Sequence, residues 1–397
     1  MASAFGPSGT AIEAFAPVTD AFARLLGDGA GGGSITVRLR GETVLALSTG
    51  WADRARTRPW TPETLGVSFS TTKGAASTVI HRLVERGLLG YDDPVCAHWP
   101  EFAAGGKGTV TVREVLTHRA GLSSVQAVAR DAEEMLDHEL MEERLAARSV
   151  RAPTARSAYH AITYGWLLSG LARRVTGRGM RELVRSELAD TLATDGLNIG
   201  APSGAEGRIA QPVGSALRQI GSVARLASPL LSATRRVRIG YEALLIPGFH
   251  RLFHGSEPPI WHAEMPAVNG LFTADGLAQL YGALANGGAE PGGPRLLTAR
   301  TVREIGRVQL RTRDRVLGLP MRWRLGYHQA FGSGDIAPRA FGHYGYGGSG
   351  GWADPAIGLS LGFVTNRIGS LTTPMGDLTL YRLNRVVREC AAAYLGR

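Results

Sequence analysis

Alternating apolar and polar residues mark the two ends of this chain. Residues 34–50 alternate around a turn at Gly41, which predicts a β-hairpin. Strand-like stretches return only towards the other end, at residues 322–331, 339–348 and 357–366. Helical spacing at residues 11–27 and 375–395 predicts a helix before the hairpin and a last helix after the strands. The pattern therefore predicts one sheet that combines segments from both ends of the chain.

Helical spacing dominates the middle of the chain. Residues 70–87 predict a helix, with Ser68 or Ser70 near its N-cap. Further helical patterns cover residues 109–195 and, closed by glycine, residues 275–288. We therefore expect a mostly helical lobe between the strands of the two ends.

These patterns predict an α/β (α+β) fold of two domains. Residues 1–95 and 290–397 are expected to form the sheet domain, and residues 96–289 an inserted, mostly helical domain. Within the insert, residues 205–260 mix apolar and basic positions irregularly. This segment is open to two interpretations, a lid or wall over a substrate pocket and a surface insertion without a role.

Composition is that of a folded protein, because 44% of the 397 residues are hydrophobic and 20% are charged. No apolar run reaches the roughly 18 residues that a membrane helix requires. The N-terminus lacks the basic start and apolar core of an export signal. The two cysteines, Cys96 and Cys390, lie far apart and predict no disulfide framework. We therefore expect a cytoplasmic protein without a membrane span.

The chain is basic, with a net charge of +10, and its basic residues are almost all arginine. Lys73 and Lys107 are the only lysines among 44 basic residues. The arginines are spread along the chain, are densest at residues 232–242, and never form a run of five or six. Nucleic-acid binding usually needs a concentrated basic patch, so we expect none.

Lys73 follows Ser70 by three residues at the predicted helix start, so both side chains share one face. A serine hydroxyl is a weak nucleophile and needs a base beside it. Lysine can serve when burial, positive charge or the helix dipole lowers its pKa, whereas arginine stays protonated. An arginine-rich chain that keeps lysine here therefore predicts a nucleophile and base pair. The pattern is short, and a chance match is the alternative.

Two glycine-rich motifs compete with this prediction. Residues 347–351 match the Gly-x-Ser-x-Gly elbow, but that elbow needs a following helix and a later histidine. Pro355 and a strand-like run follow instead, and no histidine occurs after His343. Residues 345–350 match a dinucleotide-binding pattern that also lacks its helix. We expect neither an elbow nor a dinucleotide site.

No metal-ligand pattern stands out. His250 and His254 are four residues apart, but Arg251 takes the position where a zinc protease has glutamate. The other histidines are scattered. We therefore predict no metal and no cofactor.

The segments SFSTTKGAAS, APTARSAYHAITYGWLLSGLARRVTG and FGHYGYGGSGGWADPAIGLSLGFVTN occur in this order along the chain. Together they resemble the serine β-lactamase and penicillin-binding-protein superfamily, and more narrowly the family VIII carboxylesterases. The resemblance spans most of residues 34–370. It implies a β-lactamase/transpeptidase-like fold, in which helices flank an antiparallel sheet, and an enzyme that works through an acyl-enzyme.

The resemblance also implies roles for individual residues. Ser70 would be the nucleophile, and Lys73 and Tyr159 would share the role of general base. The third motif would lie at residues 343–345, so that His343 and Gly345 contact substrate. The backbone N–H groups of Ser70 and Tyr346 would form the oxyanion hole. Tyr159 could instead be a packing aromatic, and His343 a plain strand histidine.

Two departures from the family pattern bear on the substrate. Ala161 stands where the second motif usually has asparagine, and His343 where the third usually has lysine. The first change removes a contact to a substrate amide, and the second weakens the charge that would hold a β-lactam carboxylate. Both favour an ester or thioester over a β-lactam. Asn269 is a further candidate for substrate contact.

We therefore predict a serine carboxylesterase that acts on small to medium acyl esters. The alternative is an acyltransferase of the same fold, for which a basic surface would suit an acidic donor such as coenzyme A or an acyl carrier. A weak β-lactamase and a non-catalytic binding protein rank lower. The partner is expected to be a small molecule and not nucleic acid, and the sequence leaves the oligomeric state open.

Overall fold

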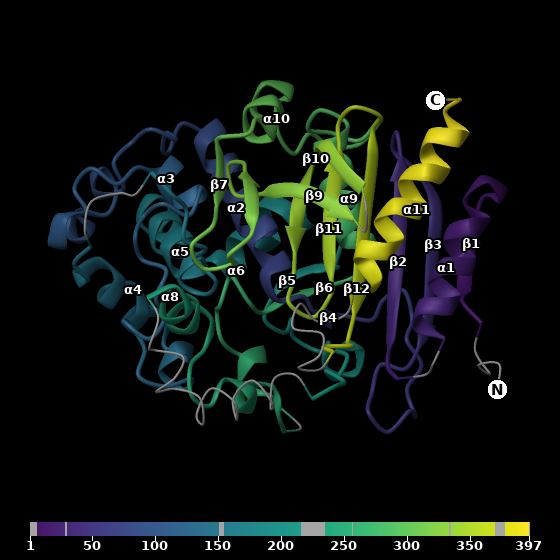
Figure 1. The fold of residues 1–397 in the computed structure, drawn as a ribbon, viewed down its shortest axis with the longest axis horizontal. Coiled ribbons are helices and arrows are strands. Elements are labelled where there is room, and N and C mark those ends of the chain that lie inside the picture. The colour runs from purple at the N-terminus through teal and green to yellow at the C-terminus, as the bar shows by residue number, and fades with distance from the viewer. Residues whose placement is uncertain are drawn as a thin grey trace.

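The computed structural model describes residues 6–27, 30–150, 155–215, 235–255, 257–332, 335–369 and 378–396. Its main feature is an antiparallel sheet with the strand order β1-β3-β2-β12-β11-β10-β9-β8-β7 (Figure 1). The strands are β1 (Ser8–Ala11), β2 (Gly32–Leu39), β3 (Glu42–Gly50), β7 (Leu310–Arg313), β8 (Pro320–Trp323), β9 (His328–Gly332), β10 (Asp335–Tyr344), β11 (Gly350–Asp354) and β12 (Leu359–Thr365).

The two ends of the chain meet at the pair formed by β2 and β12. Leu361 lies opposite Val37 in an unbroken antiparallel register. The predicted hairpin is β2 and β3, and its turn places Arg40 and Gly41 at positive φ angles of 53° and 91°. The prediction of one sheet built from both ends of the chain is confirmed.

Helices cover both faces of the sheet. Two terminal helices, α1 (Ala16–Leu26) and α11 (Thr379–Tyr394), pack together on one face, where Phe22 and Leu383 share a core with strand residues such as Phe363 (Figure 1). Two others, α2 (Thr72–Glu85) and α9 (Ala274–Ala285), belong to the core on the other face. The sheet is thus buried on both sides.

The remaining helices lie beside the sheet together with a small second sheet. The helices are α3 (Val112–Leu116), α4 (His138–Ala147), α5 (Thr163–Thr176), α6 (Met180–Leu183), α8 (Arg235–Leu244) and α10 (Ala299–Gly306). The small sheet has the order β4-β6-β5, from β4 (Gly66–Val67), β5 (Leu197–Ile199) and β6 (Gly270–Phe272). Among the described residues, no helix has both the length and the apolar character needed to cross a membrane.

The packing of α9 departs from the predicted domain boundary at residue 289. This helix lies against β2, β11 and β12 of the main sheet. Glycine makes the close approach possible, because a Cβ atom at Gly362 would lie 2.1 Å from the carbonyl oxygen of Ala274. The side chain of Ser360 also donates to the carbonyl of Ala278, at 2.9 Å. α9 therefore packs with the sheet, and the division into two domains stays a prediction.

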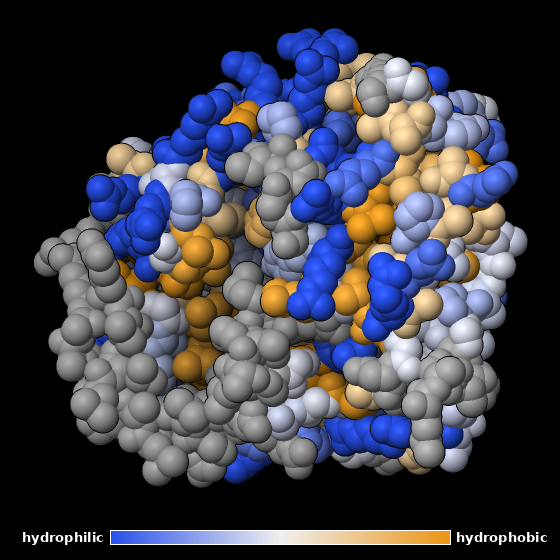
Figure 2. Space-filling model, turned by 45° about the vertical axis from the view of Figure 1, so that its right-hand side comes forward, coloured by the Kyte–Doolittle hydropathy of each residue, from blue (hydrophilic) through white to orange (hydrophobic). Residues whose placement is uncertain are grey.

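The positive charge of the chain is distributed over its surface and often paired. Arg38 contacts Glu290, Arg173 contacts Glu142, and Arg208 contacts Asp195. On the face shown in Figure 2, the most hydrophilic residues are scattered among apolar ones instead of forming a continuous band. This distribution agrees with the spread of arginine along the sequence.

Candidate active site

Ser70 lies in a tight turn that leads into α2. The turn, η2 (Phe69–Thr71), begins with Phe69 at a positive φ of 44°, which is strained for a residue with a side chain. Ser68 occupies the N-cap position of this turn, as predicted, but its hydroxyl donates to the carbonyl of Gly66 and does not cap the helix. The first N–H groups of a helical segment lack intrahelical acceptors and remain available to a ligand.

Lys73 is fully buried and its amine reaches Ser70. Its Nζ atom lies 2.8 Å from the Ser70 Oγ atom, 2.7 Å from the carbonyl oxygen of Ala161 and 3.0 Å from that of Ala267. Burial holds the pKa of Lys73 well below its ordinary value. A neutral amine has two hydrogens and one lone pair. In the neutral form the two carbonyls would accept these hydrogens, and the lone pair would face the Ser70 hydroxyl.

Tyr159 completes the group around Ser70. Its side chain is buried, with 7% exposed, and lies close to Ser70. Burial raises the pKa of Tyr159, and the nearby Ser70 side chain offsets part of that shift. The Lys73 Nζ atom lies 5.0 Å from the centre of the Tyr159 ring. The structure therefore brings all three predicted catalytic side chains together, with Tyr159 protonated at neutral pH.

His343, at the end of β10, has its ring centre 6.2 Å from that of Tyr159. Its Nδ1 atom lies 3.2 Å from the carbonyl oxygen of Tyr344 and donates to it. Burial, with smaller contributions from His328 and Lys73, holds the pKa of His343 well below its ordinary value. The imidazole is therefore neutral, and this position carries no fixed positive charge at neutral pH.

Gly345 lets the turn after β10 approach the nucleophile. A Cβ atom at this residue would lie 2.2 Å from the carbonyl oxygen of Ser68, so any side chain would collide with the backbone. The carbonyl of Ser349 accepts from both the Gly345 N–H, at 2.7 Å, and the Thr71 hydroxyl, at 2.9 Å. In the described part of the chain, the N–H of Tyr346 has no acceptor. The turn thus presents a free donor beside the Ser70 turn.

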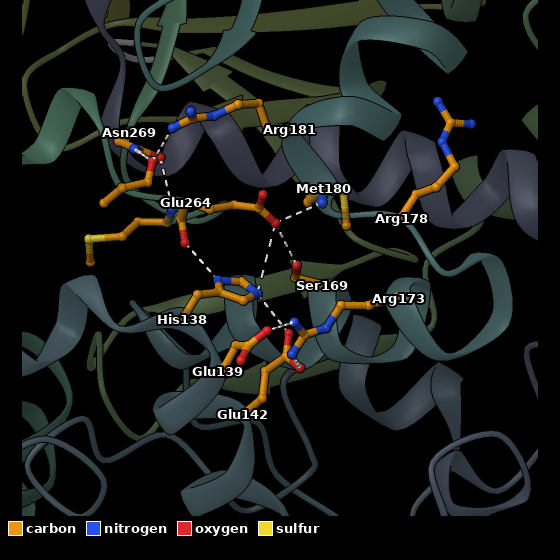
Figure 3. Close-up of polar contacts among 12 residues, drawn as sticks. His138, Glu139, Glu142, Ser169, Arg173, Arg178, Met180, Arg181, Glu264 and Asn269 are labelled. Carbon is orange, nitrogen blue, oxygen red and sulfur yellow. Dashed lines mark hydrogen bonds and ion pairs between the residues drawn. The ribbon is translucent and has the colours of Figure 1, made fainter.

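Asn269 was predicted to contact substrate, and the structure contradicts this. Its side chain is buried, its Oδ1 atom accepts from the N–H of Met265 at 3.1 Å, and its Nδ2 atom donates to the carbonyls of Ile260 and Ala263 (Figure 3). Because all three contacts are to backbone groups nearby in the chain, the amide holds its own loop in shape and is not free for a ligand.

The loop that Asn269 shapes supports Lys73 indirectly, since it carries the Ala267 carbonyl. Its other anchor is Glu264, which accepts from the Ser169 hydroxyl at 3.0 Å (Figure 3). The backbone carbonyl of Glu264 also lies 2.8 Å from the Nδ1 atom of His138 on α4. The contacts of Asn269 and Glu264 in Figure 3 therefore hold the loop that carries one of the two carbonyls that bind the amine.

Several side chains around Tyr159 had no signal in the sequence. The ring of Trp323 stacks on Tyr159 at 9° with centres 5.7 Å apart, and the ring of His118 meets its edge at 4.8 Å. Asp314, a buried carboxylate, accepts from the N–H of Tyr159 at 3.1 Å. Asp314 and Trp323 follow Tyr159 by more than 150 residues and were given no role from the sequence, so only the fold places them beside Tyr159.

The competing serine at position 349 is not placed for catalysis. Ser349 is fully buried, and its Oγ atom accepts from the N–H of Thr365 at 3.1 Å. A strand follows it, β11, where the hydrolase elbow requires a helix. The prediction against an elbow at residues 347–351 is confirmed.

The candidate lid at residues 205–260 lies partly outside the described residues, which omit 216–234 and 256. Its described end reaches the nucleophile turn, where the rings of Phe253 and Phe69 lie 5.5 Å apart. The ring of Tyr346 approaches Phe69 from another direction, at 5.9 Å. Aromatic side chains therefore border the Ser70 turn.

The family model, a curated relative and solved structures all point to the same protein family. Residues 18–383 match the Beta-lactamase family model. The chain is 43% identical to the esterase/beta-lactamase LipL of Mycobacterium tuberculosis over 390 residues, 97% of this chain and 88% of that protein. A crystal structure of a family VIII carboxylesterase has a TM-score of 0.84 at 33% identity, covering 97% of this chain and 99% of the other. A penicillin-binding protein homologue from Caulobacter crescentus has a TM-score of 0.78 at 32% identity, covering 96% and 99%.

Proposed function

The chain belongs to the beta-lactamase family and is a serine-type ester hydrolase, and we propose that it works through an acyl-enzyme formed on Ser70. The observation that carries the proposal is the hydrogen bond of 2.8 Å between the fully buried Lys73 amine and the hydroxyl of Ser70, which is itself partly exposed. A base in contact with the nucleophile is the arrangement that covalent acyl transfer requires.

Acylation follows from this contact. The Lys73 lone pair takes the Ser70 proton while the Oγ atom bonds to the ester carbonyl carbon. When the tetrahedral intermediate collapses, the bond to the alcohol oxygen breaks, and that oxygen receives a proton from Tyr159 or the lysine ammonium. In the second step water attacks the acyl group, its proton returns through the same pair, and the bond to Oγ breaks. Ser70 then regains its hydrogen and the acid leaves.

The oxyanion hole would combine two backbone donors. Ser70 lies in the first turn of a helical segment, and the N–H of Tyr346 has no acceptor among the described residues. The close approach at Gly345 brings the two turns together. Two N–H groups aimed at one oxygen stabilise the negative charge that develops on the carbonyl in the transition state.

The preferred substrate would be a carboxylic ester with a modest acyl chain. His343 is neutral, so it supplies no fixed charge for the carboxylate of a β-lactam. Ala161 has no side-chain amide, and its carbonyl is occupied by Lys73. Phe253 and Tyr346 border the nucleophile turn with apolar rings that suit an acyl chain. We also propose His343 and Gly345 as the strand-side contacts of the substrate.

Transfer of the acyl group to an alcohol or amine is the second candidate. It shares the first step, and the net charge of +10 favours an acidic donor such as a coenzyme A thioester or an acyl carrier. We also propose a cytoplasmic location, which is supported by two cysteines that are both unpaired, Cys96 and Cys390.

The test is intact mass over time during incubation with p-nitrophenyl butyrate, with and without added alcohols or amines. We expect a transient gain of one butyryl group. Clearance by water alone supports the esterase, and persistence until an acceptor is added supports the transferase. If neither oxygen esters nor thioesters give an adduct or turnover, the acyl-enzyme proposal is wrong.

Removing the Tyr159 hydroxyl should slow turnover while leaving the fold intact. We expect Tyr159→Phe to lower kcat by about 10²- to 10³-fold, because one of two groups that move the proton is lost. The measurement is steady-state hydrolysis of p-nitrophenyl butyrate. Tyr164→Phe is the matched control, since that hydroxyl is also buried but contacts Ser77. Equal losses in the two variants would contradict a catalytic role for Tyr159.

Activity should depend on pH through Lys73. Only the neutral amine can accept the Ser70 proton, so kcat/KM should fall as the pH drops through the Lys73 pKa and reach a plateau above it. Because burial lowers this pKa, the plateau should extend well below the ordinary value of 10.5. A pH profile of p-nitrophenyl butyrate hydrolysis checks this. Activity that keeps rising up to pH 10.5 would show that the amine is not depressed.

A further inference from the structure

Asp314 is a carboxylate with 1% exposure, and it lies between the end of β7 and the turn that leads to β8. Its Oδ1 atom accepts three backbone N–H groups, from Tyr159 at 3.1 Å, Val316 at 2.9 Å and Leu317 at 3.0 Å. Its Oδ2 atom accepts the hydroxyl of Ser157 at 2.6 Å. Two of these four bonds shape the local turn, and the other two hold a segment that is distant in sequence.

That distant segment carries Tyr159, and the β7–β8 hairpin holds it at further points. The Ser157 Oγ atom accepts from the indole N–H of Trp323 at 2.8 Å, and the Ser157 carbonyl accepts from the N–H of Arg315 at 3.0 Å. The indole ring of Trp323 lies nearly parallel to the Tyr159 ring. The hairpin therefore fixes the backbone of Tyr159 through Asp314 and its ring through Trp323.

The contacts from the β7–β8 hairpin determine where the hydroxyl of Tyr159 lies. Tyr159 is not on a helix of its own, since α5 begins four residues later at Thr163. Its backbone is instead bound to the edge of the sheet, and its ring lies beside the Lys73 amine that contacts Ser70. A displacement of about 1 Å in a catalytic group can cost 10²-fold in rate, so an anchor at its backbone affects chemistry.

We propose that Asp314 is a positioning residue for the reaction, which holds the Tyr159 hydroxyl against Ser70 by accepting the Tyr159 N–H and the Ser157 hydroxyl. The inference rests on the proposed role of Tyr159. It predicts that loss of the carboxylate acts on kcat through Tyr159 and leaves KM largely unchanged.

A double-mutant cycle between Asp314→Ala and Tyr159→Phe tests this, with hydrolysis of p-nitrophenyl butyrate as the readout. Alone, Asp314→Ala should lower kcat by about 10- to 10²-fold. In the Tyr159→Phe background the same change should cost less than about 3-fold, because the hydroxyl that it positions is already absent. A structural role alone would give equal losses in the two backgrounds.

Two further variants serve as controls. Asp314→Asn keeps an oxygen for the three N–H groups and places its NH₂ group towards Ser157, so its kcat should stay within about 3-fold of the native value. Asp354→Ala removes another buried carboxylate, which accepts the N–H of Ala356 at the end of β11, and should not lower kcat of the folded protein. Melting temperatures of all variants separate lost stability from lost catalysis.

The possible results are distinct. Equal losses for Asp314→Ala in both backgrounds, or no loss of kcat in a folded variant, would overturn the inference and leave the acyl-enzyme proposal intact. If Tyr159→Phe itself has native activity, the roles of Tyr159 and Asp314 both fail, while the butyryl adduct on Ser70 still tests the proposed function separately. Should Asp314→Ala not fold, the same cycle with Ser157→Ala, which frees Asp314 Oδ2, decides the question.

Discussion

Replacing Ser70 by alanine is expected to lower kcat/KM for p-nitrophenyl butyrate by about 10⁴-fold or more. Among the residues that the structure describes, the Ser70 Oγ atom is the only nucleophile that contacts the buried amine of Lys73. Without it no covalent intermediate can form, and only the residual effect of the backbone donors on attack by water remains. Since Ser70 is a small residue at the start of a helical turn, the variant should fold like the native protein.

Intact mass spectrometry and steady-state kinetics measure this result directly. Ser70→Ala should show no butyryl adduct at any time. Ser349→Ala is the matched control, because it changes the serine of the competing motif at residues 347–351. That variant should still form the adduct. An adduct in Ser70→Ala that disappears in Ser349→Ala would reverse the assignment of the nucleophile.

Replacing Lys73 by arginine should be nearly as damaging, although both residues have basic side chains. We expect a loss of about 10³-fold or more in the rate of acylation at pH 7, because a guanidinium stays protonated in proteins and cannot take the Ser70 proton. Burial holds the pKa of Lys73 low, so the native amine is available as a base. The rate of butyryl adduct formation in single-turnover experiments measures the effect.

Lys107 is the matched control in the same chain. It is also fully buried, but its amine donates to three carbonyls, those of Ala104 at 2.6 Å, Ala146 at 2.9 Å and Arg148. Three acceptors use all three hydrogens of an ammonium and leave no lone pair. Lys107→Arg should lower the free energy of unfolding by about 1–3 kcal/mol, since a larger planar group must fit the pocket. Acylation by the folded protein should be unchanged, and an equal kinetic loss in both variants would argue against Lys73 as base.

Comparison of Lys73 with Lys107 shows what the rarity of lysine in this chain does and does not indicate about function. Lysine is rare in this chain, and this rarity drew attention to Lys73, whose amine contacts Ser70. The same rarity applies to Lys107, where the requirement is a compact donor for three carbonyls and not a base. Composition therefore identifies positions where arginine does not suit, and only the contacts distinguish a neutral amine from an ammonium.

Some strands could not be predicted from the alternation of apolar and polar residues because they contain glycine, which has no side chain. β11 starts with Gly350 and Gly351, which look like a loop in the sequence. They form a strand because Tyr281 of α9 packs on the bare backbone, where a Cβ atom at Gly351 would lie 2.5 Å from its ring. The helical spacing of residues 109–195 also continued beyond the observed end of α3. This helix ends at Leu116, and His118 has a positive φ of 60°.

The part of the site that depends on neighbouring residues could be predicted from the sequence, and the part that depends on distant residues could not. Ser70 and Lys73 are three residues apart, so local geometry alone brings them together. Asp314 reaches Tyr159 across 155 residues, a contact that depends on where the sheet edge meets the insert. Asn269 was assigned wrongly because an isolated asparagine looks the same in sequence whether its amide binds a ligand or its own loop.

The pairing of β2 with β12 has a consequence for how the protein becomes active. The register places Leu39 opposite Leu359, a separation of 320 residues along the chain. Contacts between residues so far apart in the sequence form slowly, because the chain loses the entropy of the long loop before the contact stabilises it. The turn at Gly345 belongs to the late strands, while Ser70 follows the early ones. During synthesis the proposed nucleophile is therefore made long before the proposed oxyanion donor, and we expect esterase activity to appear on refolding only when the two ends of the chain have joined.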